Sequence, residues 1–289
     1  MATKISDNGF FSEEAIQKSE AIRREHRQLF FYLAEVNEQA HRYLGLLKVE
    51  SNNFKQVFTV ALFARALTAY QGLIMLAQRS FASEARATCR NILEAKFKLA
   101  YLLKEPEAAL LLIAKGEKER AKRLRSMQAG DLPVPPELAN EDWDSRIKSA
   151  EKHLKDAKGK KRKILSTKDI AYRCGLKVDY IGYYSVCSEA AHAGHIELET
   201  YLKFNADTTA VEAFVYGPED GGWIDWITLQ GAGYLLDCME ISASIFGVRS
   251  TRDFQLLFKR ILRRNNEMMQ RYRDLFIVEV GTGKLPASK

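Results

Sequence analysis

Three polar side chains in the second half of the chain have the spacing of one helical face. Tyr184, Ser188 and His192 follow one another at intervals of four residues, so a helix would place them in line. The residues around the histidine are small and would let another helix approach closely: Ala190, Ala191, Ala193 and Gly194. An imidazole beside hydroxyl groups and screened from water is typical of a site for proton transfer.

Charged side chains on two preceding segments are candidates to join this site. Arg90 and Glu94 are one helical turn apart, and Arg65 lies within a strongly apolar segment. Both arginines are expected in the interior, where a guanidinium requires a partner, and Glu94 can supply one. If the helices are neighbours, His192 faces Arg90 and Glu94. A structural ion-pair network that fixes the register of the helices is the equal alternative.

An imidazole, a guanidinium and a hydroxyl together could cleave RNA without a metal. A neutral His192 can take the proton from a ribose 2′-hydroxyl or donate one to the leaving 5′-oxygen. Arg90 can stabilise the added negative charge on the phosphorane. Tyr184 or Ser188 would position the phosphate. These residue types therefore predict a ribonuclease site that needs no cofactor.

The hydrophobic pattern predicts a mainly α protein, an antiparallel helical bundle with one small inserted β-hairpin at about 210–226. Helices are expected over about 12–48, 53–78, 83–104, 106–128, 136–158, 166–175, 179–202, 227–246 and 250–277. Ser12, Ser83 and Asp179 are predicted N-caps, and Ser166 with Asp169 resembles a capping box. Gly231 and Gly233 fall inside a helical pattern and indicate close helix packing.

The predicted domain organisation is a single helical domain over 12–280. Residues 1–11 are expected to be a disordered lead-in and 281–289 a disordered tail. The proline-rich stretch after Gly130 ends a helix, and 130–165 is expected to be a polar, mobile excursion from the bundle.

Composition points to a cytoplasmic protein. The chain has 289 residues, 46% of them apolar, and lacks the basic and apolar regions of a secretion signal. Its cysteines have no CxxC spacing and are expected to be reduced core residues: Cys89, Cys174, Cys187 and Cys238. The longest apolar run, 54–77, contains Arg65 near its middle, which favours a buried helix over a membrane span.

The formal net charge of +7 is concentrated in three segments, 115–125, 152–163 and 259–273. Clustered lysines and arginines attract nucleic acid over long range, so RNA is a candidate partner. Solvated helix faces explain the same charge. A homodimer built on an apolar face is expected, and a separate partner protein is also open.

The arrangement of Arg65, Arg90-Asn-Ile-Leu-Glu94 and Tyr184-x3-Ser188-x3-His192 resembles an uncharacterised family of bacterial all-helical proteins. It resembles, more distantly, the HEPN superfamily of helical ribonucleases and nucleotide-binding proteins, found among toxins and phage-defence proteins. The resemblance covers about 20–280 and implies a toxin or antiviral ribonuclease. HEPN nucleases carry an arginine four to six residues before the histidine, whereas here Ser188 holds that place. Only the role of His192 carries over, and Arg90 would act from another helix.

Two other functions remain open. Glu189-x2-His192 and Glu38-x2-His41 have the spacing of di-iron bundle ligands, but the apolar stripe of the first helix turns Glu38 to solvent, so half the ligand set is missing. No metal is therefore predicted. A non-catalytic binding or assembly module is the main alternative to the nuclease. Trp223 and Trp226 on the predicted hairpin are either anchors or a recognition tip.

Overall fold

The computed structural model describes residues 9–134, 136, 142–159, 164–199, 201–205, 210–214 and 223–281, and within these the protein is mainly helical. The elements in chain order are η1 (Gly9–Phe11), α1 (Glu13–Glu25), α2 (Arg27–Leu46), α3 (Phe54–Ala77), α4 (Ala82–Lys104), α5 (Ala108–Gln128), α6 (Trp143–Gly159), α7 (Thr167–Arg173), η3 (Asp179–Tyr184), α8 (Ser185–Ala191), α9 (His195–Glu199), β1 (Leu202–Phe204), β2 (Val211–Phe214), α10 (Ile224–Ile245), η5 (Val248–Ser250) and α11 (Arg252–Gly281).

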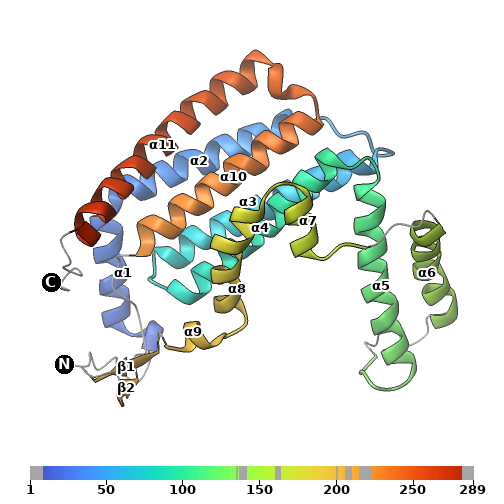
Figure 1. Cartoon of the computed structure of the whole chain (residues 1–289), viewed down its shortest axis with the longest axis horizontal. Helices are drawn as coiled ribbons and strands as arrows, with labels where there is room; N and C mark the ends of the chain where they lie inside the picture. Colours follow the sequence, from blue (N-terminus) through green and yellow to red (C-terminus); the bar gives the residue numbers. More distant parts are fainter. Residues whose placement is uncertain are drawn as a thin grey trace.

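The core lies where four long helices, α2, α3, α4 and α10, run side by side (Figure 1). The largest fully buried side chains come from these helices and include Tyr32, Tyr43, Phe63, Tyr70, Leu73 and Phe97. A Cβ built on Gly231 would lie only 2.3 Å from Cδ2 of Leu73, so α10 packs closely on α3 and any larger residue there would force the Leu73 side chain to move. The close packing predicted at Gly231 is confirmed.

Helix α3 is the apolar segment that the sequence marked as central. By length and composition, among the described residues, it alone would suffice to cross a membrane. Only 39% of its most apolar window is buried within the chain. Arg65, in the middle of this helix, is exposed, which contradicts the predicted interior position.

The predicted first helix over 12–48 is two helices. Ser12 caps α1 by accepting a hydrogen bond from the backbone of Ala15, as predicted, but the helix stops at His26. There the imidazole Nδ1 lies 2.7 Å from the Asp225 carboxylate at the start of α10, and this hydrogen bond raises the pKa of His26. The break therefore lets the chain change direction while it remains tied to α10.

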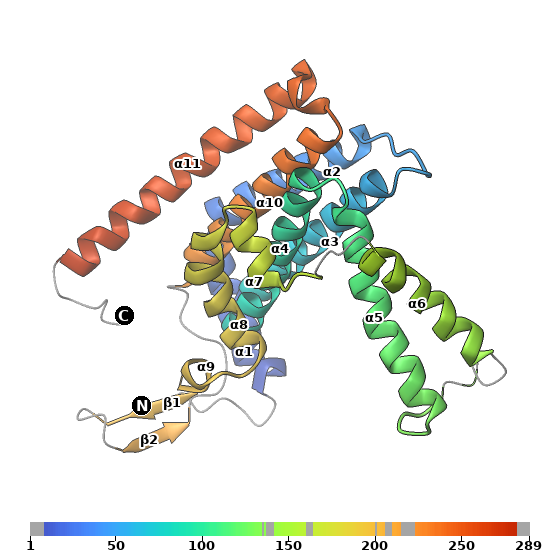
Figure 2. The same cartoon turned by 45° about the vertical axis from the view of Figure 1, so that its right-hand side comes forward.

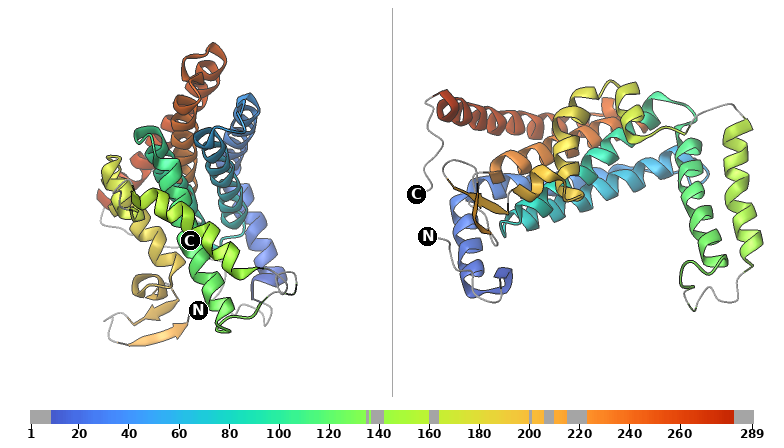
Figure 3. Two further views of the ribbon diagram at one scale, coloured as in Figure 1. Left: turned by 90° about the vertical axis from the view of Figure 1, so that its right-hand side faces the viewer. Right: turned by 60° about the horizontal axis from the view of Figure 1, so that its bottom comes forward.

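Helices α5 and α6 pack against each other and project from one end of the molecule, opposite α1 (Figures 1 and 3). We call this pair the arm. The helix expected over 106–128 forms, but α5 packs mainly on α6 and touches α3 and α4 only slightly, so most of it lies outside the group of four long helices. The second of these helices lies in the predicted excursion, of which 135, 137–141 and 160–163 fall outside the described residues.

The predicted hairpin at about 210–226 is wrong in its pairing. The strand Val211–Phe214 forms, but its antiparallel partner is the upstream strand Leu202–Phe204. Trp223 and Trp226 lie at the start of α10, where Trp226 stacks on Tyr183 at 6.1 Å between ring centroids. Much of the intervening turn, 215–222, lies outside the described residues. The alternating pattern identified one strand, but its pairing depends on a non-local partner.

The C-terminal helix α11 contacts α10 and then extends away from the core (Figure 2). Asn265, buried on this helix, accepts a hydrogen bond from the hydroxyl of Tyr32 at 2.7 Å. Arg260 and Arg264 both pair with Glu35 of α2, at 3.1 Å each. These bonds hold α11 against α2. Of the predicted lead-in and tail, 1–8 and 282–289 lie outside the described residues.

Candidate functional site

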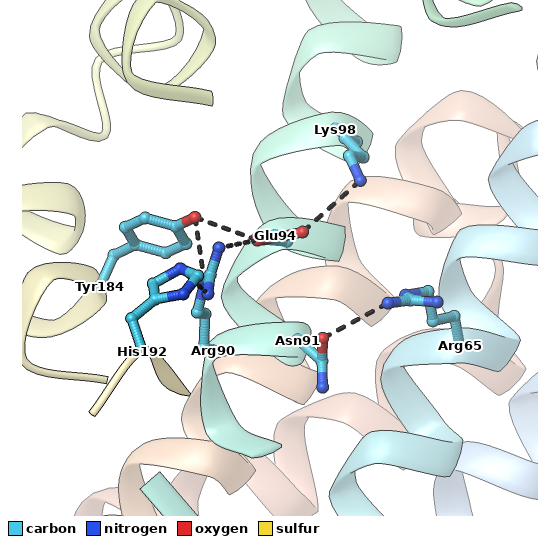
Figure 4. A network of polar contacts seen from close by, with 7 residues as sticks. All are labelled: Arg65, Arg90, Asn91, Glu94, Lys98, Tyr184 and His192. Atoms are coloured by element: carbon cyan, nitrogen blue, oxygen red, sulfur yellow. Dashed lines mark hydrogen bonds and ion pairs between the residues drawn. The ribbon is translucent and has the colours of Figure 1, made fainter. Parts of the chain in front are cut away.

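Four of the polar residues singled out from the sequence meet on one side of α4 (Figure 4). The Arg90 guanidinium places Nη1 at 2.8 Å from Nε2 of His192 and donates from Nε to the Tyr184 hydroxyl at 3.1 Å. Its Nη2 lies 3.1 Å from Glu94 Oε1, to which Tyr184 also donates, at 3.0 Å. We call Arg90, Glu94, Tyr184 and His192 the arginine cluster.

Local breaks in helical geometry present the cluster residues on the η3–α8 segment. The single helix predicted over 179–202 is instead a π-helix, η3, followed by the short helix α8. Tyr184 ends η3, and such π-turns are frequent at functional sites. Asp179, the predicted N-cap, is the first residue of η3, and its carboxylate bonds to Lys96 instead.

A tight C-terminal turn holds His192 in place. His192 is the C-cap of α8, and the amide of Gly194 donates to the carbonyl of Glu189 at 2.9 Å, the bond of a Schellman motif. Ala193 occupies the left-handed position of this turn with φ of 47°, where glycine is usual. A non-glycine residue there is strained, and such strain often accompanies functional residues.

The contact between Arg90 and His192 fixes the state of the imidazole. A guanidinium only donates, so Nε2 of His192 must accept and the proton must reside on Nδ1. His192 is exposed, whereas the side chains of Arg90 and Glu94 are 21% and 19% exposed. The cluster thus has a cation held by several partners, the Arg90 guanidinium, and an accessible imidazole at its edge whose Nε2 accepts from it.

The charges of the cluster reinforce one another. Burial lowers the pKa of Arg90, but the hydrogen bond to Tyr184 and the attraction of Glu94 outweigh it, so the pKa is raised. Burial raises the pKa of Tyr184, which keeps the phenol protonated. Arg90 also lies over the Tyr184 ring, 5.2 Å from its centroid. The tyrosine is therefore a neutral hydroxyl that accepts from Arg90 and donates to Glu94.

Arg65 does not join the cluster. Its guanidinium donates to Asn91 at 3.3 Å, on another side of α4 from His192 (Figure 4). Lys98, which the sequence analysis did not single out, lies 3.7 Å from Glu94 and extends the network. Burial lowers the pKa of Lys98, and the charges of Arg65 and Lys115 lower it further. The four-residue spacing from Glu94 to Lys98 was the available sequence signal.

The remaining predicted site residues, Ser188 and Glu189, contact the cluster through their backbone carbonyls, which both accept from the His192 amide. Ser188 accepts the amide of His192 through its carbonyl at 3.1 Å, while its side chain makes no described bond to the cluster. The Glu189 carboxylate folds over Gly194, where a Cβ would lie 1.6 Å from Oε2. Among the described residues no group of three or more histidine, cysteine, aspartate or glutamate side chains is arranged to hold a metal.

The di-metal ligand set does not assemble. Glu38 is an exposed side chain 2.5 Å from Arg42 on the same helix, and His41 lies 2.9 Å from the amide of Gln71. Both groups are therefore engaged on the surface of α2.

A second polar network, which the sequence analysis missed, lies further along α4. The Lys96 ammonium is 2.7 Å from a carboxylate oxygen of Asp179 and 2.7 Å from one of Asp237. It also lies over the Tyr234 ring, 5.0 Å from the centroid. We call Lys96, Asp179, Asp237 and Tyr234 the lysine cluster. The available sequence signal was that Lys96 lies four residues after Ile92 and three before Leu99, in register with an apolar helical face.

The chain was compared with models of known protein families. A model described as a family of unknown function (DUF5677) matches residues 56–209, just over half of the chain. The chain belongs to the DUF5677 family. The match includes the whole arginine cluster, from Arg90 on α4 to His192 just after α8, and leaves out α1, α2, β2, α10 and α11. No curated protein and no solved structure matches the chain.

Proposed function

We propose that this DUF5677 protein is a metal-independent endoribonuclease that acts through His192 and Arg90. The observation that carries the proposal is the 2.8 Å contact between Nη1 of Arg90 and Nε2 of an exposed His192. It brings a base and a phosphate-binding cation together from helices about 100 residues apart in sequence.

The hydrogen bonds suggest how substrate binding would start the reaction. Arg90 is fixed by Glu94 and Tyr184 through Nη2 and Nε, so Nη1 is the group that can exchange its partner. A phosphodiester oxygen, being an anion, is a stronger acceptor than a neutral imidazole. Phosphate binding to Nη1 would therefore release the Nε2 lone pair of His192.

The released imidazole would then act as a general base. Nε2 of His192 takes the proton of the ribose 2′-hydroxyl, and the 2′-oxygen attacks phosphorus. The bond from phosphorus to the 5′-oxygen breaks, and the leaving oxygen takes a proton from water. Arg90 stabilises the charge that develops on the phosphorane. The products are a 2′,3′-cyclic phosphate and a free 5′-hydroxyl.

The charge of the arm supports RNA as the substrate class. Along α5 the exposed side chains include Lys118, Lys122 and Arg123, with Lys115 nearer the core. Lys115 is close enough to Lys98 to lower its pKa, so positive charge continues from the arm toward Glu94. Such a stripe attracts the phosphate backbone over long range and in a salt-dependent way.

The test is RNA cleavage by purified protein in EDTA, with analysis of the product ends. We expect 2′,3′-cyclic phosphate ends, and a decrease of at least about a hundredfold in rate for His192→Gln. The matched control is His195→Gln, which alters an exposed histidine paired with Glu199 outside the cluster. Intact RNA across a broad substrate panel, or equal losses in both variants, would refute the proposal.

The alternative is a binding or assembly module in which the cluster only fixes helix register. The observation that favours it is that every side of the Arg90 guanidinium already has a partner within the chain. In that case Arg90→Met lowers the melting temperature, and His192→Gln changes no activity. Thermal shift and RNA binding measured on the same two variants distinguish the alternatives.

The proposal extends to the setting of the protein. We propose an antiparallel bundle as the scaffold, a homodimer as the functional unit, and a cytoplasmic toxin or phage-defence effector as the role. The resemblance to HEPN proteins supports this setting. Sedimentation of the purified protein measures the oligomeric state independently of any cleavage.

A further inference from the structure

A cavity of about 290 Å³ lies where η1 and α1 meet the turn between α3 and α4, at the end of the molecule opposite the arm (Figure 3). No residue of the arginine or lysine cluster lines it. The volume is close to the lower end of the range of small-molecule sites, which favours a ligand no larger than one nucleotide. The cavity walls combine apolar side chains with two arginines, and include Phe10, Phe11, Ile16, Phe81, Arg23 and Arg79.

Three features hold the walls of this cavity together. The Ser19 hydroxyl donates to the carbonyl of Gln78 at 2.7 Å, which ties α1 to the end of α3. The Phe10 and Phe81 rings stack with 4.0 Å between their centroids, which ties η1 to the start of α4. Ser80 is buried and takes the left-handed position with φ of 58°, which closes the C-terminal turn of α3. The two walls are therefore joined before any ligand binds.

The two arginines bring positive charge to the cavity without a counter-charge. Arg23 on α1 and Arg79 after α3 both line it, and no aspartate or glutamate does. Within the part of the chain that the structure describes, neither guanidinium has a hydrogen-bond or ion-pair partner. Two like charges beside one small cavity repel each other, and an anion that contacts both would remove this repulsion. The ligand indicated by the charge is therefore an anion.

We infer that this cavity binds a nucleotide through a terminal phosphate, as a free nucleotide or as the phosphorylated end of an RNA chain. A phosphate monoester carries about 1.5 to 2 negative charges at pH 7, which matches two guanidinium groups. A phosphodiester within an RNA chain carries a single charge and matches less well. Each guanidinium can bond to phosphate oxygens through two N–H groups. The ring of Phe11 is 89% exposed and offers a face on which the base can stack.

The experiment is calorimetric titration of the full-length protein with AMP, adenosine, ribose 5-phosphate and inorganic phosphate. We expect AMP to bind at least about tenfold more tightly than each of the others, because only AMP has both a phosphate and a base. Arg23→Gln and Arg79→Gln should each weaken AMP binding by at least about tenfold, as expected for the loss of a charge-assisted contact. Arg24→Gln is the matched control and should not change it, because Arg24 is an exposed neighbour on α1 that does not line the cavity.

Phe11→Ala separates base stacking from the attraction of charge. The Phe11 ring is mostly exposed, so its removal should not lower the melting temperature of the free protein. AMP binding should weaken by about fivefold or more, the loss expected for one base stacked on an aromatic ring. Binding of ribose 5-phosphate, which has no base, should not change.

Two oligoribonucleotides that differ only in a 5′-phosphate distinguish the two sources of the nucleotide. They are titrated into His192→Gln, so that RNA cleavage does not interfere and the cavity is unaltered. A phosphorylated oligonucleotide that binds more tightly than AMP identifies the RNA end, and the reverse order identifies the free nucleotide. The inference is overturned if AMP does not bind, if adenosine binds as tightly as AMP, or if any of Arg23→Gln, Arg79→Gln and Phe11→Ala binds AMP as tightly as the unaltered protein. AMP binding is measured without RNA, so this inference and the proposed ribonuclease fail separately.

Discussion

The arginine and lysine clusters use the same helix in two different ways. Arg90 and Lys96 are six residues apart on α4, about 9 Å along its axis, and face different sides. Each cation lies over a tyrosine ring at about the same distance, 5.2 and 5.0 Å. Lys96 has two carboxylate partners, whereas Arg90 has one carboxylate, a neutral hydroxyl and a neutral imidazole.

The difference shows what makes a buried cation reactive or inert. Lys96 is 7% exposed, and a ligand could not easily replace its two carboxylate partners. Its main effect is therefore to join α4 to η3 and α10. Arg90 is 21% exposed, and its weakest partner, His192, is exposed and uncharged in this contact. A neutral partner at the surface can be replaced by a phosphate at low cost. The comparison therefore predicts that the lysine cluster contributes mainly to stability and the arginine cluster to function.

The largest expected effect is from removing the lysine cation. Lys96→Met leaves Asp179 and Asp237 without their shared partner and should lower the free energy of unfolding by about 3 kcal/mol. Lys98→Met, two residues on, removes a longer and more exposed pair together with a charge that burial disfavours, so it should change the free energy of unfolding by under about 1 kcal/mol. Urea unfolding measures both. Equal effects would contradict the difference drawn between the clusters.

The second effect distinguishes stability from function in the arginine cluster. Tyr184→Phe removes one acceptor for Arg90 and one donor to Glu94, so unfolding should be easier by about 1 kcal/mol. Under the proposed function, RNA cleavage should also decrease by about tenfold, because Arg90 loses a contact that orients it. Tyr180→Phe, which alters the ring stacked on Tyr184, is the control. Unchanged cleavage by Tyr184→Phe would show that Tyr184 has no role in orienting Arg90 for the reaction.

The third prediction uses the opposite pKa shifts of two lysines. The pKa of Lys96 is raised, so its stabilising contribution is complete below about pH 10.4 and is lost as pH rises through the folded-state value. The pKa of Lys98 is lowered by burial, so its charge opposes folding below the folded-state value, and this cost is relieved as pH approaches about 10.4. Unfolding free energies from about pH 8 to 11, compared with each Met variant, should show opposite slopes. Slopes of the same sign would refute the opposite directions of the pKa shifts of Lys96 and Lys98.

The smallest effect is the response to salt. Glu94→Gln weakens pairs with Arg90 and Lys98 that are partly open to water, at a cost of about 1 kcal/mol. Raising NaCl from about 0.1 to 1 M shortens the screening length to about 3 Å, so this cost should decrease. The effect of Lys96→Met should persist, because its ammonium is buried. Thermal unfolding at the two salt concentrations provides the measurement.

Local signals in the sequence predicted the features that depend on neighbouring residues. The Ser12 cap and the Ser166–Asp169 capping box formed as expected, because each needs only a few consecutive residues. Ser83 was a wrong cap, since α4 begins at Ala82 after Phe81. The polar residues Arg90, Glu94, Tyr184 and His192 were selected by their spacing, although their roles remain proposals.

Errors arose where a distant partner decided the local conformation. His26 ends α1 beside Asp225, and Asp179 bonds to Lys96 instead of capping a helix. The strand at Val211–Phe214 pairs upstream rather than downstream. In each case local propensity offered several conformations of similar free energy, and a tertiary contact selected one.

The sequence by itself determined a mainly helical protein and the residue types that could do acid–base chemistry, because periodicity and side-chain chemistry are local properties. Only the tertiary structure decided that Arg90 meets His192 while Arg65 turns to Asn91, and that Lys96 is shared by Asp179 and Asp237. The physical reason is that such contacts depend on the packing and rotation of whole helices, to which residues far apart in the chain contribute.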